Sequence, residues 1–461
     1  MLVYDEWYIL QKKKLFGTDG IRGKSNLYPM IPEVALKIGR GVACLYKQKN
    51  LAKEHRVIIG KDTRLSGYLF ENALTSGILA ENVNVLLTGP MPTPAIAYLT
   101  KALNCDAGIM ISASHNSAED NGIKIFSYKG YKLKDYREEQ IEETVFADYC
   151  ENETKKNKVG KATRIEDASG RYIEFLKHTI SYNSLEGLRI VLDCANGAAY
   201  KIAPQLFSEL KADVIPINVS PNGLNINLDC GALHPKAMKK AVLEHKADLG
   251  IALDGDADRL IVCDEKGNIL DGDYLMAIFA IELKKQKKLK KDTLVATVMS
   301  NYGLDECMKK HKIKVIKADV GDRFVIGKLR AEGYSFGGEQ SGHIIFAEYS
   351  TTGDGLLSAL QLCNILVQQK KKMSELAKVL HKYPQILINV KVKEKISLDK
   401  LNLFVSEKRK AERLLRNKGT LLVRYSGTEN ICRVMVEGKN EFMIKEIAEN
   451  LAEILRKEIG V

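Results

Sequence analysis

A serine and a histidine able to take part in nucleophilic chemistry stand together after an apolar run. Ser114 and His115 follow the segment AGIMI, and the Asn121-Gly122 pair predicts a turn that brings Lys124 back toward the same edge. A sheet holds the loop at the end of a strand in place, which suits a reactive side chain. Serine and asparagine are also common in ordinary turns. For this segment alone, an inert turn is therefore as good an interpretation as a catalytic loop.

Three aspartates alternate along the segment LDGDADR, which lies between two apolar runs. In an extended chain Asp254, Asp256 and Asp258 would point to one side and converge on one hard cation. The alternative is an acidic hairpin turn, which the third aspartate and the adjacent Arg259 make less favourable. A calcium-binding EF-hand is excluded, because Arg259 stands where that loop needs glycine and its flanks resemble strands rather than helices.

A third polar segment, GGEQSGH, follows a short strand-like run. Glu339 and Ser341 are able to hydrogen-bond sugar hydroxyls, and the glycines allow a ligand to approach the backbone closely. The reference pKa of histidine lies near neutrality, so His343 is a candidate for moving a proton. A histidine that only makes structural hydrogen bonds is the alternative, and the two interpretations stay equally open.

A fourth polar segment, RYSGTE, lies between two strand-like runs. Arg424, Ser426, Gly427 and Thr428, with Arg433 beyond them, offer a guanidinium, hydroxyls and backbone N–H groups that suit a phosphate. The alternative is a polar hairpin between two strands. A hairpin and a phosphate site are compatible, so the segment predicts both.

Together with the segment FGTDGIRG at residues 16–23, these motifs resemble the α-D-phosphohexomutase family. The resemblance runs from about Leu15 to the C-terminus, with the motifs in the family's order. It implies that Ser114 carries a phosphoryl group and that Ser114, Asp254, Asp256 and Asp258 hold one Mg²⁺. It also implies the other site residues: catalytic Lys124, His343 and Arg259, and substrate-binding Thr18, Arg22, Glu339, Ser341, Arg424, Ser426, Gly427, Thr428 and Arg433.

The resemblance implies a mutase that moves phosphate between O6 and O1 of a hexose phosphate. Its intermediate and activator would be a sugar 1,6-bisphosphate. Gln340 and the opening GTDGIRG motif favour glucosamine phosphates, which feed cell-wall synthesis, over glucose or mannose phosphates. A sugar phosphatase and a catalytically silent sugar-phosphate sensor are alternatives. Ser117 and Asn430 stand where the family usually has proline, so we expect looser loops there.

The length and the order of apolar runs predict several α/β domains. A chain of 461 residues exceeds a single core and suits three or four domains of ~100–150 residues. Short apolar strands alternate with helical stretches, which predicts parallel-rich sheets covered by helices. The resemblance implies three similar α/β domains and a smaller C-terminal α+β domain around a central cleft. We place them at residues 1–163, 164–266, 267–382 and 383–461.

The composition favours an enzyme that acts on small molecules. A formal net charge of +12 suits phosphorylated substrates, and no nucleic-acid motif accompanies the basic run LKKQKKLKK. Nine scattered cysteines without a Cys-x-x-Cys pair argue against disulfides and zinc, which favours the cytoplasm. No apolar run approaches the ~20 residues of a membrane span. We therefore expect sugar phosphates as partners, with neither nucleic acid nor membrane, while a homodimer is left open.

Overall fold

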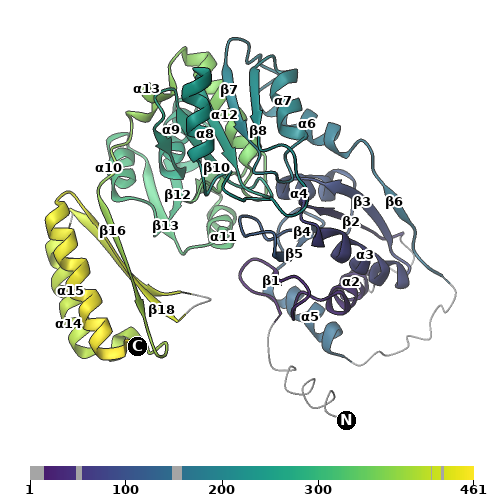
Figure 1. Cartoon of the computed structure of the whole chain (residues 1–461), viewed down its shortest axis with the longest axis horizontal. Helices are drawn as coiled ribbons and strands as arrows, with labels where there is room; N and C mark the ends of the chain where they lie inside the picture. The colour runs from purple at the N-terminus through teal and green to yellow at the C-terminus, as the bar shows by residue number, and fades with distance from the viewer. Residues whose placement is uncertain (1–14, 48–53, 148–157, 417, 427–429) are drawn as a thin grey trace.

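The computed structural model describes residues 15–47, 54–147, 158–416, 418–426 and 430–461. These residues form four sheets in sequence order, each accompanied by its own helices (Figure 1). The parts built on the first and the fourth sheet lie at opposite ends of the view, purple and yellow, with the second and third sheets between them. The predicted α/β class, three mixed sheets followed by a smaller antiparallel one, is confirmed.

The first sheet is parallel at its centre and antiparallel at one edge. Val57 and Ile59 belong to one buried cluster with helices α2, α3 and α5, whereas Ile58 belongs to another with α4. This alternation explains why helices cover both faces. The strand order is β1 (Ile21–Lys24), β5 (Asp120–Ser127), β4 (Ala107–Ile111), β2 (Arg56–Lys61), β3 (Asn84–Pro90) and β6 (Ala162–Arg164). The helices are α2 (Pro32–Lys47), α3 (Ser66–Ala80), α4 (Thr93–Ala102) and α5 (Asp135–Phe146).

The second and third sheets repeat this plan of parallel strands with an antiparallel edge. The second runs β11 (Ile269–Leu270), β10 (Leu260–Asp264), β9 (Leu249–Leu253), β7 (Arg189–Asp193) and β8 (Asp213–Ile217), with α6 (Ala168–Thr179), α7 (Ile202–Glu209) and α8 (Lys236–His245). The third runs β13 (Lys314–Ala318), β12 (Thr293–Thr297), β14 (Phe336–Gly338) and β15 (Ile344–Phe346). Its helices are α9 (Gly272–Lys285), α10 (Tyr302–Lys310), α11 (Asp322–Glu332), α12 (Gly355–Gln369) and α13 (Met373–Ala377).

The fourth sheet is antiparallel and small. It runs β16 (Gln385–Lys391), β18 (Ile431–Gly438) and β17 (Gly419–Tyr425), and α14 (Asn402–Leu415) and α15 (Glu441–Ile459) pack on it (Figure 1). It has a hydrophobic core of its own, whereas a single buried cluster runs from α4 through the second sheet into the third. That shared core ties together the ends of β4, β9 and β14, where three of the four polar motifs lie.

One detail bears on the predicted domain limits. The first boundary, between residues 163 and 164, falls inside β6, which pairs with β3 of the first sheet. The domain limits therefore stay a prediction. Among the described helices, none combines the length and the apolarity that crossing a membrane requires. All eight cysteines in the described part of the chain are free thiols.

Candidate active site

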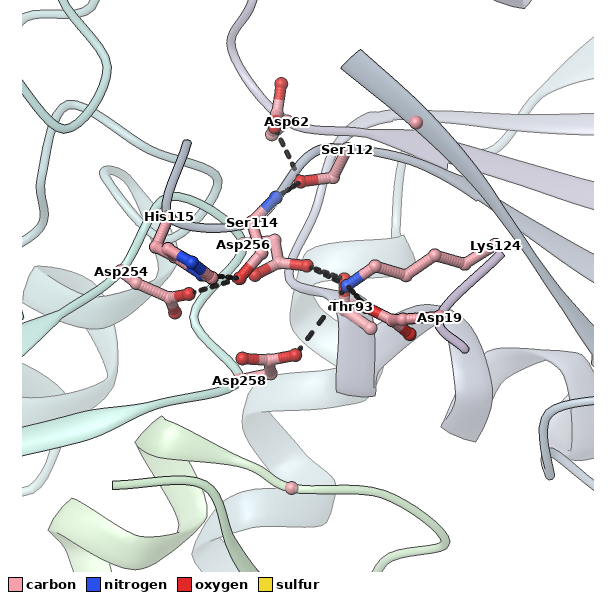
Figure 2. Close-up of polar contacts among 12 residues, drawn as sticks. Asp19, Asp62, Thr93, Ser112, Ser114, His115, Lys124, Asp254, Asp256 and Asp258 are labelled. Atoms are coloured by element: carbon pink, nitrogen blue, oxygen red, sulfur yellow. Dashed lines mark hydrogen bonds and ion pairs between the residues drawn. The ribbon is translucent and has the colours of Figure 1, made fainter. Parts of the chain in front are cut away.

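Ser114 is buried at the carboxyl end of β4. Its backbone is left-handed, with φ 53°, and only 1% of the residue is exposed. The hydroxyl Oγ donates to Asp254 Oδ2 over 2.6 Å and lies 3.3 Å from His115 Nδ1 (Figure 2). Burial and the nearby Arg259 and Arg22 lower the pKa of His115 to about 4. The serine hydroxyl thus lies between the carboxyl group of Asp254 and a neutral imidazole.

The three aspartates of the β9–β10 loop converge, but through a turn rather than along an extended strand. Ala257 adopts a left-handed conformation, φ 57°, and ligand oxygens of Asp254, Asp256 and Asp258 lie within 4.8 Å of one another. All three residues are buried, and Asp256 Oδ1 and Asp258 Oδ1 have no hydrogen-bond partner among the described residues. Converging carboxylate oxygens that are buried and unsatisfied fit a hard divalent cation.

Burial and neighbouring charges shift the pKa values of the aspartates in the cluster. Burial, followed by the charges of Asp258 and Asp256, raises the pKa of Asp254 to about 8. Burial would also raise the pKa of Asp258, but contacts with His343 and Lys124 hold it below its usual range. Without a bound divalent cation, the aspartate cluster therefore keeps a proton on Asp254 at neutral pH. A bound divalent ion would release that proton.

Lys124 reaches the aspartate cluster from β5. Its Nζ donates to Asp256 Oδ2 over 2.8 Å, and Thr93 Oγ1 donates to the same oxygen over 2.6 Å (Figure 2). Burial would lower the pKa of Lys124, but Asp19, Asp256 and Asp258 raise it above its usual range. The amine is therefore a cation in this structure, whereas a general base would need a lowered pKa.

His343 lies in the β14–β15 loop between two carboxylates. Its Nδ1 is 3.6 Å from Asp258 Oδ1, and its Nε2 is 3.6 Å from Asp322 Oδ2. Burial would lower the pKa of His343, but Asp258 and Asp322 raise it to about 9. The backbone N–H of Gly353 donates to Nε2 over 2.9 Å, which requires an unprotonated nitrogen and opposes that rise. This direct hydrogen bond favours the neutral ring with its proton on Nδ1, toward Asp258.

The β14–β15 loop stands beside the aspartate loop. An isolated β-bridge joins Arg259 to His343, and the backbone N–H of Arg259 donates to Asp254 Oδ1 over 3.2 Å. Glu339 Oε1 accepts the backbone N–H of Gly321 over 2.9 Å, which fixes the carboxylate. The Ser341 hydroxyl lies 3.5 Å from the other oxygen, Oε2, of Glu339. The predicted sugar loop and the predicted metal loop are thus neighbours.

The N-terminal segment adds an ionic chain to the site. Asp19 contacts Arg22 and Lys132, and Lys132 Nζ also lies 2.5 Å from Asp322 Oδ2 at the start of α11. Of the two predicted residues in this segment, Arg22 is partly buried and Thr18 is exposed in the turn between Gly17 and Gly20. The sequence interpretation did not single out Asp19 or Asp322, the two aspartates that contact Lys132.

Relatives of this chain share its whole length. Four domain models of the phosphoglucomutase/phosphomannomutase family match it: α/β/α domain I at residues 13–151, domain II at 170–267, domain III at 271–383 and the C-terminal domain at 387–454. The phosphoglucosamine mutase of Geobacter metallireducens is 53% identical over 450 residues, which cover 97% of this chain and 99% of that protein. The chain belongs to the α-D-phosphohexomutase family. The phosphoglucosamine mutase of Desulfotalea psychrophila is also 53% identical, over 96% of this chain and 99% of its own length.

Solved structures of other phosphohexomutases share the fold. A phosphoglucomutase/phosphomannomutase family protein of Burkholderia thailandensis superimposes with a TM-score of 0.80 at 21% identity, covering 97% of this chain and 99% of its own. The N-acetylphosphoglucosamine mutase of Aspergillus fumigatus, in complex with GlcNAc-6P and magnesium, superimposes with a TM-score of 0.67 at 18% identity over 98% of both chains. At these identities the likeness shows the common fold.

The predicted phosphate loop of this phosphohexomutase joins β17 to β18. Arg424 and Arg433 lie directly opposite each other on these strands, and burial followed by the Arg433 charge lowers the pKa of Arg424. Two opposed like charges are unfavourable in a sheet unless an anion joins them. Ser426 is buried after β17, whereas Gly427 and Thr428 lie outside the described residues.

Four residues that the sequence interpretation passed over hold the site together. Asp62 and Arg64 follow β2, Thr93 begins α4 and Asn227 lies in a loop after β8. One signal could have found the first two, because the polar run DTR follows the apolar strand VIIG as the other motifs follow theirs. No sequence signal marks Asn227, which lies more than a hundred residues from the loop that it contacts.

Proposed function

We propose that the protein is a phosphoglucosamine mutase, which interconverts glucosamine 6-phosphate and glucosamine 1-phosphate through a phosphoserine at Ser114 and a 1,6-bisphosphate. The observation that carries this proposal is the buried contact of 2.6 Å between Ser114 Oγ and Asp254 at the centre of the aspartate cluster. Full-length relatives named phosphoglucosamine mutase support the amino sugar. The complex of the Aspergillus enzyme with GlcNAc-6P and magnesium supports a phosphorylated amino sugar and a divalent cation.

We propose Mg²⁺ as the cation, held by Asp254, Asp256 and Asp258 together with an oxygen of phosphorylated Ser114. The donor set is entirely oxygen, as Mg²⁺ prefers, and two of its atoms accept no hydrogen bond from any described residue. Bound there, Mg²⁺ would neutralise the charge that spreads over the transferring phosphoryl group. We propose that the guanidinium of Arg259, whose backbone N–H donates to Asp254 Oδ1, binds another oxygen of that group.

In the first half of the reaction, the phosphoryl group moves from Ser114 to the free hydroxyl of a glucosamine monophosphate. The bond from phosphorus to the sugar oxygen forms, the bond to Ser114 Oγ breaks, and the hydroxyl proton passes to a base. Ser114 Oγ takes up a proton as it leaves. In the second half, Ser114 Oγ loses that proton and bonds to the phosphorus of the other phosphate, while the bond from this phosphorus to the sugar oxygen breaks and a proton goes to that oxygen. The protein contributes mainly positioning and charge to such a transfer.

Lys124 and His343 are the candidates for moving the proton. The raised pKa keeps Lys124 protonated, so it would give its proton only to a strongly basic group such as the alkoxide of a departing oxygen. His343 keeps Nε2 in a hydrogen bond with Gly353, so it would act on a substrate only after that contact opens. The two residues approach different oxygens of Asp258: Lys124 Nζ lies 3.7 Å from Oδ2, and His343 Nδ1 lies 3.6 Å from Oδ1.

Substrate binding is assigned to the remaining loops. The pair Arg424 and Arg433, with Ser426, Gly427 and Thr428, would hold the phosphate that is not reacting. Glu339 and Ser341 would bind sugar hydroxyls, and Thr18 and Arg22 would contact the substrate from the N-terminal segment. A dedicated grip on the second phosphate favours a mutase over a phosphatase, which has no need of one. Glucosamine 1,6-bisphosphate or a similar bisphosphate would prime the enzyme.

The proposal is tested by ³¹P NMR of the protein with Mg²⁺ and a trace of sugar 1,6-bisphosphate. Glucosamine 6-phosphate should isomerise faster than glucose 1-phosphate or mannose 1-phosphate offered in separate tubes. Ser114→Ala should abolish turnover, while Ser117→Ala, an exposed serine of the same loop, should leave it intact. Faster turnover of glucose or mannose phosphate would refute the choice of sugar. Release of inorganic phosphate without isomer would instead show a phosphatase.

A further inference from the structure

We propose that Arg64 and Asn227 form a clamp across the first two sheets that positions the loop carrying Ser114 for phosphoryl transfer. The clamp rests on the proposed function, since it assumes that Ser114 carries the phosphoryl group. Both residues act through the backbone of the loop, so they are positioning residues rather than catalytic ones.

Arg64 uses four of its five side-chain N–H groups to hold the Ser114 loop. A guanidinium has five N–H groups. In this fully buried side chain, Nε donates to Asp62 Oδ2 over 2.9 Å. The other four N–H groups face four backbone carbonyls of the loop. Nη2 donates to the carbonyls of Ser114 (3.1 Å) and Asn116 (2.9 Å), and Nη1 donates to those of Ser117 and Asp120 (3.0 Å).

A second path from Arg64 reaches the N–H side of Ser114. The Ser112 hydroxyl donates to Asp62 Oδ2 over 2.6 Å, and the backbone N–H of Ser114 donates to Ser112 Oγ over 2.8 Å (Figure 2). The carbonyl and the N–H of Ser114 are therefore both tied to the same Arg64–Asp62 pair. The left-handed backbone of Ser114 is unfavourable for a residue with a Cβ, so it persists only while its surroundings hold it.

Asn227, which follows β8 of the second sheet, also hydrogen-bonds the Ser114 loop. Its Nδ2 donates to the carbonyls of Ser114 over 2.9 Å and Asn116 over 3.0 Å, the two carbonyls to which Nη2 of Arg64 also donates. Gly255 of the aspartate loop leaves room for this arrangement, because a Cβ there would lie 2.6 Å from the Ser114 carbonyl and 2.8 Å from Asn227 Nδ2. The clamp thus sets the position of Ser114 relative to the aspartates.

The alternative is that Arg64 only satisfies buried carbonyls and stabilises the fold. The two roles differ in what they change. A structural role alters the unfolding temperature, whereas a positioning role lowers kcat with little change in KM, because reactive geometry is lost while binding groups stay. A displacement of about 1 Å at a reacting centre can cost about 10²-fold in rate.

The experiment compares three variants of the full-length enzyme with the wild type. Arg64→Lys keeps the charge but offers three donors in place of five. Asn227→Ala removes the grip from the second sheet alone. Thr63→Val is the matched control, because its Oγ1 bonds the Asn196 carbonyl over 2.5 Å and so joins the same two parts without touching the Ser114 loop. We measure kcat and KM for glucosamine 6-phosphate, the unfolding temperature, and the phosphoserine resonance in ³¹P NMR.

Arg64→Lys should lower kcat about 10²-fold and Asn227→Ala about 10-fold, with KM changed less than about 3-fold in both. The phosphoserine resonance should move in both variants. Thr63→Val should keep kcat and the resonance, even where its unfolding temperature falls. If Arg64→Lys and Asn227→Ala fold and keep kcat within about 3-fold of wild type, the clamp is overturned.

Should Arg64→Lys fail to fold, Asn227→Ala decides by the same criteria. Failure of the proposed function looks different. Then the wild type itself shows no phosphoserine resonance, or Ser114→Ala keeps full turnover. In that case Arg64 would position a loop with no part in catalysis, and the clamp would be overturned together with the proposed function.

Discussion

Asp254→Asn should stabilise the cation-free protein while abolishing its response to Mg²⁺. The pKa of Asp254 is raised from 3.8 to about 8 in the folded state, by burial and by the two neighbouring aspartates. The folded protein thus keeps a proton that the unfolded chain releases. Folding stability contributed by this residue therefore falls as the pH rises from 3.8 toward 8.

The size of the effect follows from 1.36 kcal/mol for each pH unit. The penalty is about 2 kcal/mol at pH 5 and about 4 kcal/mol at pH 7. An asparagine carries no such penalty. It also keeps both contacts of Asp254, since its Oδ1 can accept the backbone N–H of Arg259 and its Nδ2 can donate to Ser114 Oγ. The variant should therefore gain up to these amounts of unfolding free energy.

The assay is urea unfolding of both proteins at pH 5 and pH 7, with EDTA and then with millimolar Mg²⁺. Without cation the variant should be the more stable protein, by a margin that widens with pH. With Mg²⁺ the wild type should gain stability and the variant should not. Asp264→Asn is the control, a buried aspartate that accepts the backbone N–H groups of Lys266 and Asn268, and it should lose stability at both pH values. The reasoning is refuted if Asp254→Asn is the less stable protein at pH 7 in EDTA.

Three further changes test other parts of the site. Lys132→Met should lower the unfolding free energy by about 3 kcal/mol, since it leaves the Asp322 carboxylate without the cation that now neutralises it. Lys132→Arg should restore most of the loss. An unchanged urea midpoint for Lys132→Met would contradict this expectation. Thr93→Val removes the hydroxyl that orients Asp256, so a Mg²⁺ titration should show about 10-fold weaker binding. Arg424→Met should raise KM for glucosamine 6-phosphate about 10-fold or more and lower kcat less, and a pure kcat effect would remove this residue from phosphate binding.

The motifs and the strands before them could be read from the sequence because both depend on local chain properties. The apolar runs before Ser114 and Asp254 are strands β4 and β9, buried in every residue. The hairpin expected around RYSGTE is present as β17 and β18. Alternation along an extended strand was the wrong reason for the convergence of the aspartates. The left-handed turn at Ala257 brings them together instead, and alanine carries no signal for such a turn.

The protonation states of the site residues could not be predicted from the sequence, because they depend on which groups are buried together. The raised pKa of Lys124 arises from Asp19, which is 105 positions away, and from the aspartates of another sheet. The same is true of His343, whose proton is governed by Gly353 and by two carboxylates from different loops.

The sequence by itself determined the order of the strands and helices, the residues able to do chemistry and the family to which they belong, since each of these is carried by neighbours along the chain. Only the tertiary structure decided how those residues are held. Arg64 and Asn227 meet at the Ser114 carbonyl from two different sheets. Packing of the shared core brings such distant residues into hydrogen-bond range, and no local pattern encodes the distance between them.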